Sequence, residues 1–254
     1  MRTYTVDALV LRTYRYGEAD RIVVFLTEDR GKKRGVAKNA TVSRRRFGGA
    51  LEPFTRGRVT YVERENRELV RVDRIEPRAT PLLATTGRPA GEAAYLLGHA
   101  AYFAELLDQW APEDAPNERL FRLGAAMSDA LGQAGSIEAL ARYFEYWLLR
   151  IEGVYPALVV CPRCGRATLG QGAWLAMSER AYICLECGHG RPRLSPEAVA
   201  CVRGFARQKP AEAAVDVPAR ILREVEGVHD RLMALHLERE LRSARVVREL
   251  GHNS

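Results

Sequence analysis

The stretch Arg21-Ile22-Val23-Val24-Phe25-Leu26-Thr27 is short, apolar and rich in residues that favour extended backbone. Before it, Val6, Ala8 and Val10 recur at every second position and alternate with Asp7, Leu9 and Leu11. This period of two is typical of a strand with one buried face. The sequence therefore opens with two predicted β-strands.

Three further strands are predicted downstream. Gly31 and Gly35 bracket a basic segment, and residues 57–65 and 68–76 form two more strands around Asn66-Arg67, which suits a hairpin turn. Five short strands between residues 3 and 78 predict a small barrel, for which an OB-fold is the best fit. An SH3-like barrel has similar strand spacing and stays open as an alternative.

The rest of the chain reads as helical. Pro77, Pro81, Gly87 and Pro89 mark a linker, and apolar residues then recur at helical spacing in residues 91–110, 117–133 and 137–151. Ser136 and Ser195 stand where an N-cap is expected, and Pro218 opens a last helical region that runs to about Leu250.

Two CxxCG motifs interrupt the helical part. The first is Cys161-Pro162-Arg163-Cys164-Gly165 and the second is Cys184-Leu185-Glu186-Cys187-Gly188. Such paired turns supply four thiolates in a tetrahedron, which is the closed arrangement of structural zinc. Metal-free thiols and an iron–sulfur cluster are the alternatives. His189 is a possible substitute for one thiol, and Cys201, outside the pattern, is read as a core residue.

These patterns together predict an α+β chain of several domains. An OB-fold nucleic-acid-binding domain spans residues 1–80, and the first part of a helical domain spans 81–157. A four-cysteine zinc module spans 158–192, and the second part of the helical domain spans 193–254.

The positive charge is concentrated in the predicted barrel. Residues 1–80 hold 19 Lys/Arg and 11 Asp/Glu, whereas residues 81–254 hold 20 and 21. Between Arg30 and Leu51 there are eight basic residues and no acid: Arg30, Lys32, Lys33, Arg34, Lys38, Arg44, Arg45 and Arg46. A flexible basic loop on a barrel suggests phosphate contacts, with Arg12, Arg15 and Arg21 as flanking contacts. A merely solvated loop is the alternative, and Phe47 and Phe54 are read as core residues rather than stacking platforms.

Recognised catalytic motifs are missing from the sequence. It contains no Gly-rich phosphate loop ending in Lys-Ser/Thr, no nucleophile-elbow serine and no HExxH helix. None of the five histidines sits in a catalytic motif, and His99 is read as a packed residue of an Ala-rich helix. There is no apolar run of membrane-spanning length and no signal-peptide core at the start, so a cytoplasmic protein without a catalytic centre is expected.

The sequence resembles the RecO family of bacterial recombination-repair proteins. In the first third the resemblance rests on Gly17-Glu18-Ala19-Asp20-Arg21-Ile22-Val23, on Gly35-Val36-Ala37-Lys38 and on the run from Ser43 to Phe54. Further on it rests on residues 101–107 and 142–149, on Gly153-Val154-Tyr155-Pro156 before Cys161, and on Leu241-Arg242-Ser243. Asn39 replaces an expected glycine, and asparagine tolerates a positive φ.

The resemblance implies an OB-fold, a helical domain and an inserted zinc module. It further implies binding of single- and double-stranded DNA, strand annealing without ATP, and help in loading RecA on SSB-coated DNA with RecR. The partners would then be DNA, RecR and the acidic C-terminal tail of SSB, for which Arg142 or Arg150 is a candidate contact, in a nucleoid-associated cytoplasmic protein.

Two other classes of function remain open at the level of sequence. A zinc-ribbon transcription or translation factor would use the basic barrel on RNA in preference to single-stranded DNA. A small nuclease or transferase would show metal-dependent turnover.

Overall fold

The structure is a computed structural model that describes residues 1–65, 67–215, 217–237 and 241–251. The chain divides into two compact units, one formed by residues 1–133 with 240–254 and the other by residues 134–239. Asn66 of the predicted hairpin turn lies outside the described residues.

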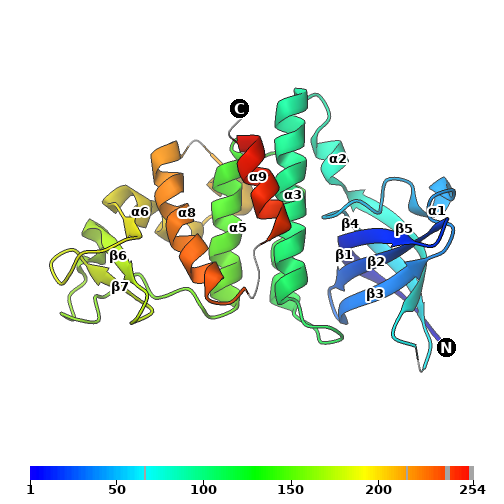
Figure 1. The fold of residues 1–254 in the computed structure, drawn as a ribbon, viewed down its shortest axis with the longest axis horizontal. Helices are drawn as coiled ribbons and strands as arrows, with labels where there is room; N and C mark the ends of the chain where they lie inside the picture. The colour runs from blue at the N-terminus through cyan, green and yellow to red at the C-terminus, as the bar shows by residue number, and fades with distance from the viewer. Residues whose placement is uncertain (66, 216, 238–240, 252–254) are drawn as a thin grey trace. The chain divides into compact units, whose positions relative to one another are not determined.

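Five strands form a closed barrel in the first unit (Figure 1). They pair in the order β1-β2-β3-β5-β4, and β4 pairs back with β1. Their bounds are β1 (Arg2–Tyr16), β2 (Asp20–Thr27), β3 (Gly31–Ala37), β4 (Arg56–Glu63) and β5 (Val70–Ala79). Only β3 and β5 run parallel among these pairs. The arrangement confirms the predicted OB-like barrel, although β5 extends through Pro77, which the sequence assigned to a linker.

The barrel interior is filled by alternate residues of its strands. Val10, Val23, Phe25 and Tyr61 are all 1% exposed or less and belong to one apolar cluster. Phe47 of helix α1 (Arg44–Phe47) joins the same cluster. The fully buried Phe54 packs against Phe103 with ring centroids 5.5 Å apart. Phe47 and Phe54 are therefore both core residues, as predicted.

Four helices besides α1 belong to the same unit as the barrel among the described residues. They are α2 (Pro81–Ala84), α3 (Ala90–Trp110), α4 (Glu118–Ala130) and α9 (Arg242–Gly251). Thr80 and Asn117 cap α2 and α4, because each side chain accepts a backbone N–H of the first turn. α3 packs against both β1 and α9, and His99 on it is 2% exposed, as expected of a packed residue. No helix among the described residues is both long and apolar enough to cross a bilayer.

The segment after α3 is bonded to the barrel through Lys32. The Lys32 N–H donates to Pro112 O at 3.2 Å, and the Asp114 N–H donates to Lys32 O at 3.1 Å. Gly31 is required beside this crossing, because a Cβ there would lie 2.4 Å from Ala115 O and φ is +70°. The Lys32 side chain, 8% exposed, reaches the Asp108 carboxylate at 3.3 Å and donates to Asp108 O at 2.6 Å. Charge pairing therefore accompanies the backbone contact between β3 and the end of α3.

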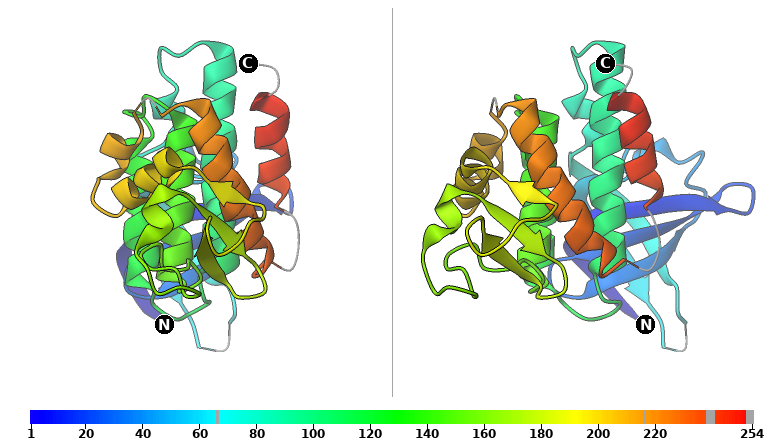
Figure 2. Two further views of the ribbon diagram at one scale, coloured as in Figure 1. Left: turned by 90° about the vertical axis from the view of Figure 1, so that its left-hand side faces the viewer. Right: turned by 60° about the vertical axis from the view of Figure 1, so that its left-hand side comes forward.

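The second unit combines helices with a small antiparallel sheet. Its helices are α5 (Ile137–Ile151), α6 (Pro196–Phe205), α7 (Pro210–Ala213) and α8 (Ala219–Ala234), with a 3-10 turn η1 (Thr168–Gln171). Its strands are β6 (Ala173–Ala176), β7 (Ala181–Cys184) and β8 (Arg193–Leu194), in the order β7-β6-β8 (Figure 2). Ser136 and Ser195 cap α5 and α6, which confirms both predicted helix starts.

The compact units divide the chain differently from the predicted domains. α3, α4 and α9 group with the barrel, whereas α5 to α8 group with the cysteine-containing sheet. The predicted last helical region is two helices, α8 and α9, and these belong to different units. Helical periodicity marks each helix but carries no information about which neighbour it packs against.

We expect Asp108→Ala to lower the free energy of unfolding by about 3 kcal/mol, because it leaves the buried Lys32 ammonium without a counter-charge. Asp129→Ala is the matched control, since the Asp129 carboxylate is 52% exposed and pairs with Arg56 at the surface. The control should change stability by about 1 kcal/mol or less. Urea unfolding measures both variants, and equal losses would contradict a stabilising role for the buried pair.

Candidate metal centre and nucleic-acid interface

The four predicted metal ligands come together in the second unit. The sulfur atoms of Cys161, Cys164, Cys184 and Cys187 all lie within 4.8 Å of one another, and Cys164 Sγ is 3.9 Å from Cys184 Sγ. Four sulfurs at about 2.3 Å from a tetrahedral zinc would be about 3.8 Å apart. The thiols thus fit a four-coordinate metal ion and leave no open position on it. His189 is not part of the cluster.

Backbone turns position the first pair of cysteines. Gly165 N–H donates to Cys161 O at 2.9 Å, and Cys161 N–H donates to Arg166 O at 3.0 Å. Gly165 has φ +69°, a conformation that glycine adopts without strain. Cys184 ends β7 and pairs across the sheet with Ala173, and Cys187 N–H donates to Cys184 O at 3.2 Å. The sheet therefore holds one side of the cluster and the turn after Cys161 holds the other.

The surroundings of the cysteines favour thiolate at two positions. The Thr168 hydroxyl lowers the pKa of Cys184 to about 6, and the backbone at Arg166 lowers the pKa of Cys164. Hydrogen bonding with Cys184 raises the pKa of Cys187 to about 12. Neighbouring thiols in the cluster therefore compete for protons. A bound cation would end that competition, because metal binding displaces the proton from a thiol. Cys201 is different: it is half-buried rather than a core residue, and burial raises its pKa to about 11.

A buried polar network lies between α5, α8 and the sheet of the same unit. His229 Nδ1 is 2.9 Å from Glu145 Oε2, and Arg142 pairs with Glu145 at 2.8 Å and with Glu226 at 3.0 Å. Burial lowers the pKa of His229, so its imidazole is neutral near pH 7. The Tyr155 ring packs on His229, and the Tyr182 hydroxyl donates to Tyr155 Oη at 3.0 Å. The network connects the helices with β7, the strand that ends at a metal ligand.

The eleven basic residues predicted to contact DNA lie on the barrel, but their segment is not a flexible loop. β3 pairs with β2 from Gly31 to Ala37, and residues 44–47 form helix α1. The prediction of a flexible loop is wrong because both glycines lie within a continuous strand pairing. The set comprises Arg12, Arg15, Arg21, Arg30, Lys32, Lys33, Arg34, Lys38, Arg44, Arg45 and Arg46, and the Arg44 side chain lies outside the described structure.

Acids from distant parts of the sequence pair with four of these cations. Asp108 pairs with Lys32 and also with Arg12, both at 3.3 Å. Lys33 pairs with Glu63 at 3.0 Å and Asp114 at 2.7 Å, and Arg34 pairs with Glu113 at 2.5 Å. The sequence of this segment contains no acid, but in the structure its cations are therefore not all free. The acids are at least thirty residues away in sequence, and folding brings them to β3.

Three more of the predicted residues have structural contacts. Arg30 stacks on the Tyr4 ring at 3.9 Å from the centroid, and Arg21 Nη1 is 3.4 Å from Asp20 O. Arg46 donates to Ser43 Oγ at 2.9 Å and to Lys38 O at 2.7 Å. These bonds make Arg46 a brace for the turn between β3 and α1.

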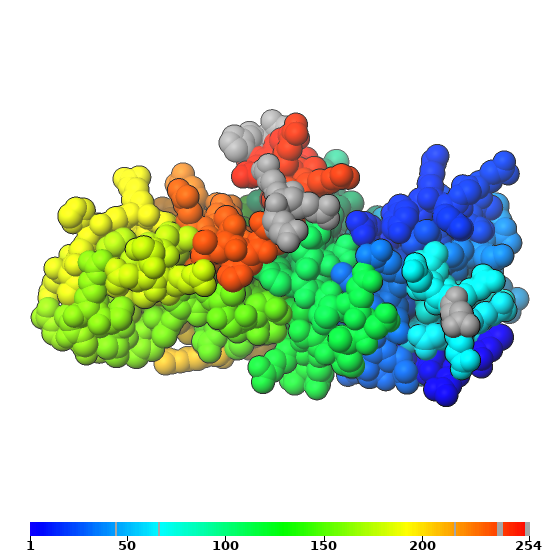
Figure 3. All heavy atoms as spheres, turned by 60° about the horizontal axis from the view of Figure 1, so that its bottom comes forward, coloured from blue at the N-terminus to red at the C-terminus, as the bar shows by residue number. Residues whose placement is uncertain are grey.

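The remaining cations gather where the β1–β2 hairpin meets that turn. Thr41 N–H donates to Ala19 O at 3.1 Å, and Asn39 N–H donates to Asp20 Oδ1 at 2.8 Å. Asn39 has φ 54°, so it fills the position of the expected glycine. The hairpin extends beyond the rest of the barrel (Figures 2 and 3). Exposed at this site, which we name the hairpin end, are Tyr14, Arg15, Tyr16, Lys38 and Arg45.

The two tyrosines were missed by sequence reasoning. Tyr14 is 41% exposed and Tyr16 is 49% exposed, and in β1 they alternate with Arg15. Among the described residues, Arg15, Lys38 and Arg45 form no ion pair within 4.0 Å. Exposed aromatic rings beside unpaired cations can stack on bases while the cations bind phosphates. The sequence did contain a signal for them: Tyr14 and Tyr16 stand at alternate positions near the end of a predicted strand, which indicates two rings on one face of it.

An OB-like barrel with an exposed basic and aromatic end, followed by helices and a four-cysteine module, defines the class of protein: a multidomain α+β chain with a candidate nucleic-acid interface and a candidate metal centre. The family model for "Recombination protein O N terminal" matches residues 1–81, and the model for "Recombination protein O C terminal" matches residues 92–245. The chain belongs to the RecO family of DNA repair proteins.

Relatives named DNA repair protein RecO agree with this assignment. One from Geobacter sulfurreducens is 35% identical over 256 residues, which is 98% of this chain and 99% of the relative. One from Anaeromyxobacter sp. (strain K) is 34% identical over 97% of this chain and 96% of the relative. One from Koribacter versatilis is 44% identical over 161 residues, which is 63% of this chain and 62% of the relative.

Proposed function

We propose that the protein is a recombination mediator that binds single- and double-stranded DNA during bacterial DNA repair. The observation that carries the proposal is the hairpin end. There, three exposed cations that form no ion pair within 4.0 Å among the described residues, and two exposed tyrosines, lie on the β1–β2 hairpin and on the segment bonded to it. Phosphates would bind the cations, and unstacked bases would rest on the rings.

We further propose that the protein anneals complementary strands without ATP and assists RecA loading on SSB-coated DNA together with RecR. Two strands that bind one basic surface lose part of their mutual repulsion, and base stacking then drives pairing. This role needs no catalytic centre and no nucleotide. It places the protein in the cytoplasm, at the nucleoid.

The SSB tail is proposed to bind the second unit at Arg150. Arg142, the other candidate, is buried and engaged with Glu145 and Glu226. Arg150 is exposed and lies over the rings of Tyr146 and Trp147, at 5.7 and 5.9 Å from their centroids. An acidic peptide with an apolar tip would find a cation and the half-buried Trp147 ring there.

Calorimetric titration with an SSB tail peptide should therefore give saturable heat, and Arg150→Gln should weaken binding about tenfold, as expected when a charge-assisted hydrogen bond is lost. Arg207→Gln, which removes an exposed charge from the same unit, should leave the affinity unchanged. Equal affinity of the two variants would refute this assignment.

The proposed metal is zinc, held by Cys161, Cys164, Cys184 and Cys187. Four thiolates at tetrahedral spacing satisfy zinc completely, so its contribution is to folding of the second unit. The double CxxCG pattern and the sulfur distances support this choice over the alternatives.

We expect one zinc per purified chain by elemental analysis. Cys184→Ser should lose the metal and lower the thermal midpoint, because a closed site contributes binding energy to folding. Cys201→Ser is the control, since that thiol lies outside the cluster, and it should retain the zinc. Zinc-free protein whose four thiols all react freely in the native state would exclude the proposal.

The proposed DNA interface predicts the behaviour of one triple variant. Changing Arg15, Lys38 and Arg45 to Ala should flatten the log–log salt dependence of single-stranded DNA binding by about 2, at roughly 0.7 per phosphate contact. Annealing measured without nucleotide should slow in parallel. Arg46 is left intact because it braces the turn.

The matched control removes three other exposed arginines of the same unit, Arg58, Arg119 and Arg122. It should keep the parental salt slope and annealing rate. If both variants fold and have the same slope, the hairpin end is not the DNA site, and strict ATP dependence of annealing would contradict the wider proposal.

A further inference from the structure

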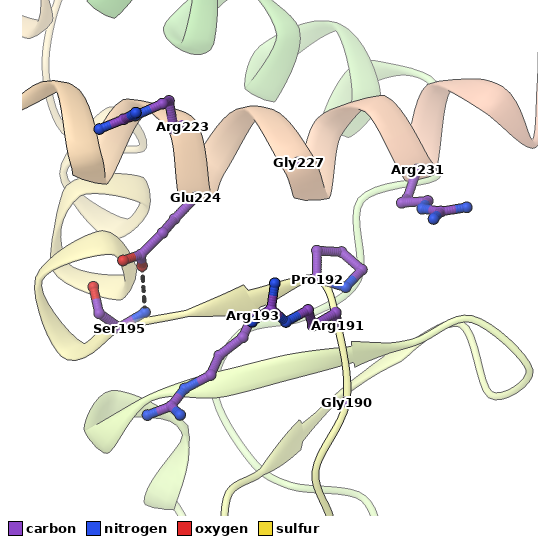
Figure 4. Close-up of a pocket in the computed structure, with 9 residues that line it drawn as sticks. All are labelled: Gly190, Arg191, Pro192, Arg193, Ser195, Arg223, Glu224, Gly227 and Arg231. Atoms are coloured by element: carbon purple, nitrogen blue, oxygen red, sulfur yellow. Dashed lines mark hydrogen bonds between the residues drawn. The ribbon is translucent and has the colours of Figure 1, made fainter.

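The second unit contains a groove lined mainly by arginines. It lies between α8 and the segment from Gly190 to Ser195 and has a volume of about 700 Å³ (Figure 4). Its four basic residues are Arg191, Arg193, Arg223 and Arg231, and all four are exposed. Residues 134–239 carry 14 Lys/Arg against 12 Asp/Glu, so this concentration is local and does not reflect the charge of the unit.

The arginine side chains have no acid partner in the part of the chain that the structure describes. Glu224 is the single acid among the described lining residues, and its Oε2 accepts the Ser195 N–H at 2.7 Å. That bond directs the carboxylate toward the start of α6, as the dashed line in Figure 4 shows. The field in the groove is therefore positive.

One face of α8 forms the floor of the groove, and the residues on that face leave the floor open. Arg223, Gly227 and Arg231 recur at every fourth residue and so share one face of the helix. The two arginines are separated by about 12 Å of helix rise. Gly227 leaves the space between them free of side chain, and a Cβ there would meet only Pro192 Cβ, at 3.8 Å. In Figure 4 Arg191 and Arg193 belong to the facing segment, and the Arg193 side chain extends away from α8.

We propose that this groove binds the phosphodiester backbone of single-stranded DNA, as a second strand contact in addition to the hairpin end. Guanidinium groups bind phosphate oxygens in bidentate geometry, and cations repeated along a groove suit a ligand whose charges repeat along a chain. The groove favours DNA over an acidic peptide, because Pro192 is its only apolar lining side chain among the described residues and peptide side chains would find no pocket. The inference rests on the proposed function, because it takes DNA as the ligand of the protein.

Two variants of the full chain test the groove with an oligothymidylate, which forms no secondary structure. Arg223→Gln with Arg231→Gln should flatten the log–log salt slope by about 1.4, at roughly 0.7 per contact. Arg180→Gln with Arg207→Gln removes the same charge from exposed positions of the same unit and should leave the slope unchanged. Gly227→Trp should weaken binding by filling the floor without loss of charge, whereas Gly227→Ala should bind like the parent.

Zinc content and thermal midpoint identify any variant that fails to fold, and Gly227→Trp then provides a second, charge-neutral readout. An unchanged slope in the folded Arg223/Arg231 variant overturns the inference and leaves the hairpin end as the DNA site. Poly-glutamate serves as the acidic-peptide probe. If the folded Arg223/Arg231 variant loses binding of poly-glutamate but keeps the binding of DNA, the inference is also overturned, and the groove binds peptides instead. If the parent protein itself binds no DNA, the proposed function fails. Results on the groove variants bear only on the groove and leave the proposed function standing.

Discussion

The Asp108 carboxylate forms ion pairs with cations on two strands of the barrel: Arg12 on β1 and Lys32 on β3. Lys32 and Asp108 are each 8% exposed, so the pair is screened little by solvent. The contact joins the end of α3 to the outer surface of the barrel, and the backbone pairing of Lys32 with residues 112–114 follows directly after it. The position of α3 against the barrel depends on this junction, and so does the distribution of free charge.

The junction separates the basic residues into two groups with different roles. Cations in the first half of β3 pair with Asp108, Glu113 and Asp114, and of these cations Lys32 is buried against the end of α3. Cations beyond the end of β3, among them Lys38 and Arg45, form no ion pair within 4.0 Å in the described structure and face solvent. The net positive charge of the first eighty residues is therefore presented at one end of the barrel rather than along the whole basic segment.

This division explains how far sequence reasoning reaches. Patterns that depend on neighbours in sequence were confirmed: the apolar strand around Val23, the capping serines Ser136 and Ser195, and the cysteine pairs. Features that depend on distant residues were not predicted. Nothing in the basic segment indicates that Asp108 will neutralise Lys32, and nothing in the last helical pattern indicates that α8 and α9 belong to different units. Periodicity shows which face of an element is buried, but not which element buries it.

The cysteine cluster and the arginine groove are both consequences of one local arrangement in the second unit. β8 pairs with β6, and the segment that leads into it also forms one wall of the groove against α8. β6 pairs on its other side with β7, whose last residue is Cys184. A metal that fixes Cys184 therefore also fixes the sheet from which Arg191 and Arg193 are presented. Under the two proposals, a metal held by the four cysteines would do no chemistry on DNA. It would fix the position of the segment that carries Arg191 and Arg193, so that the repeated phosphates of a DNA strand would meet cations already in place.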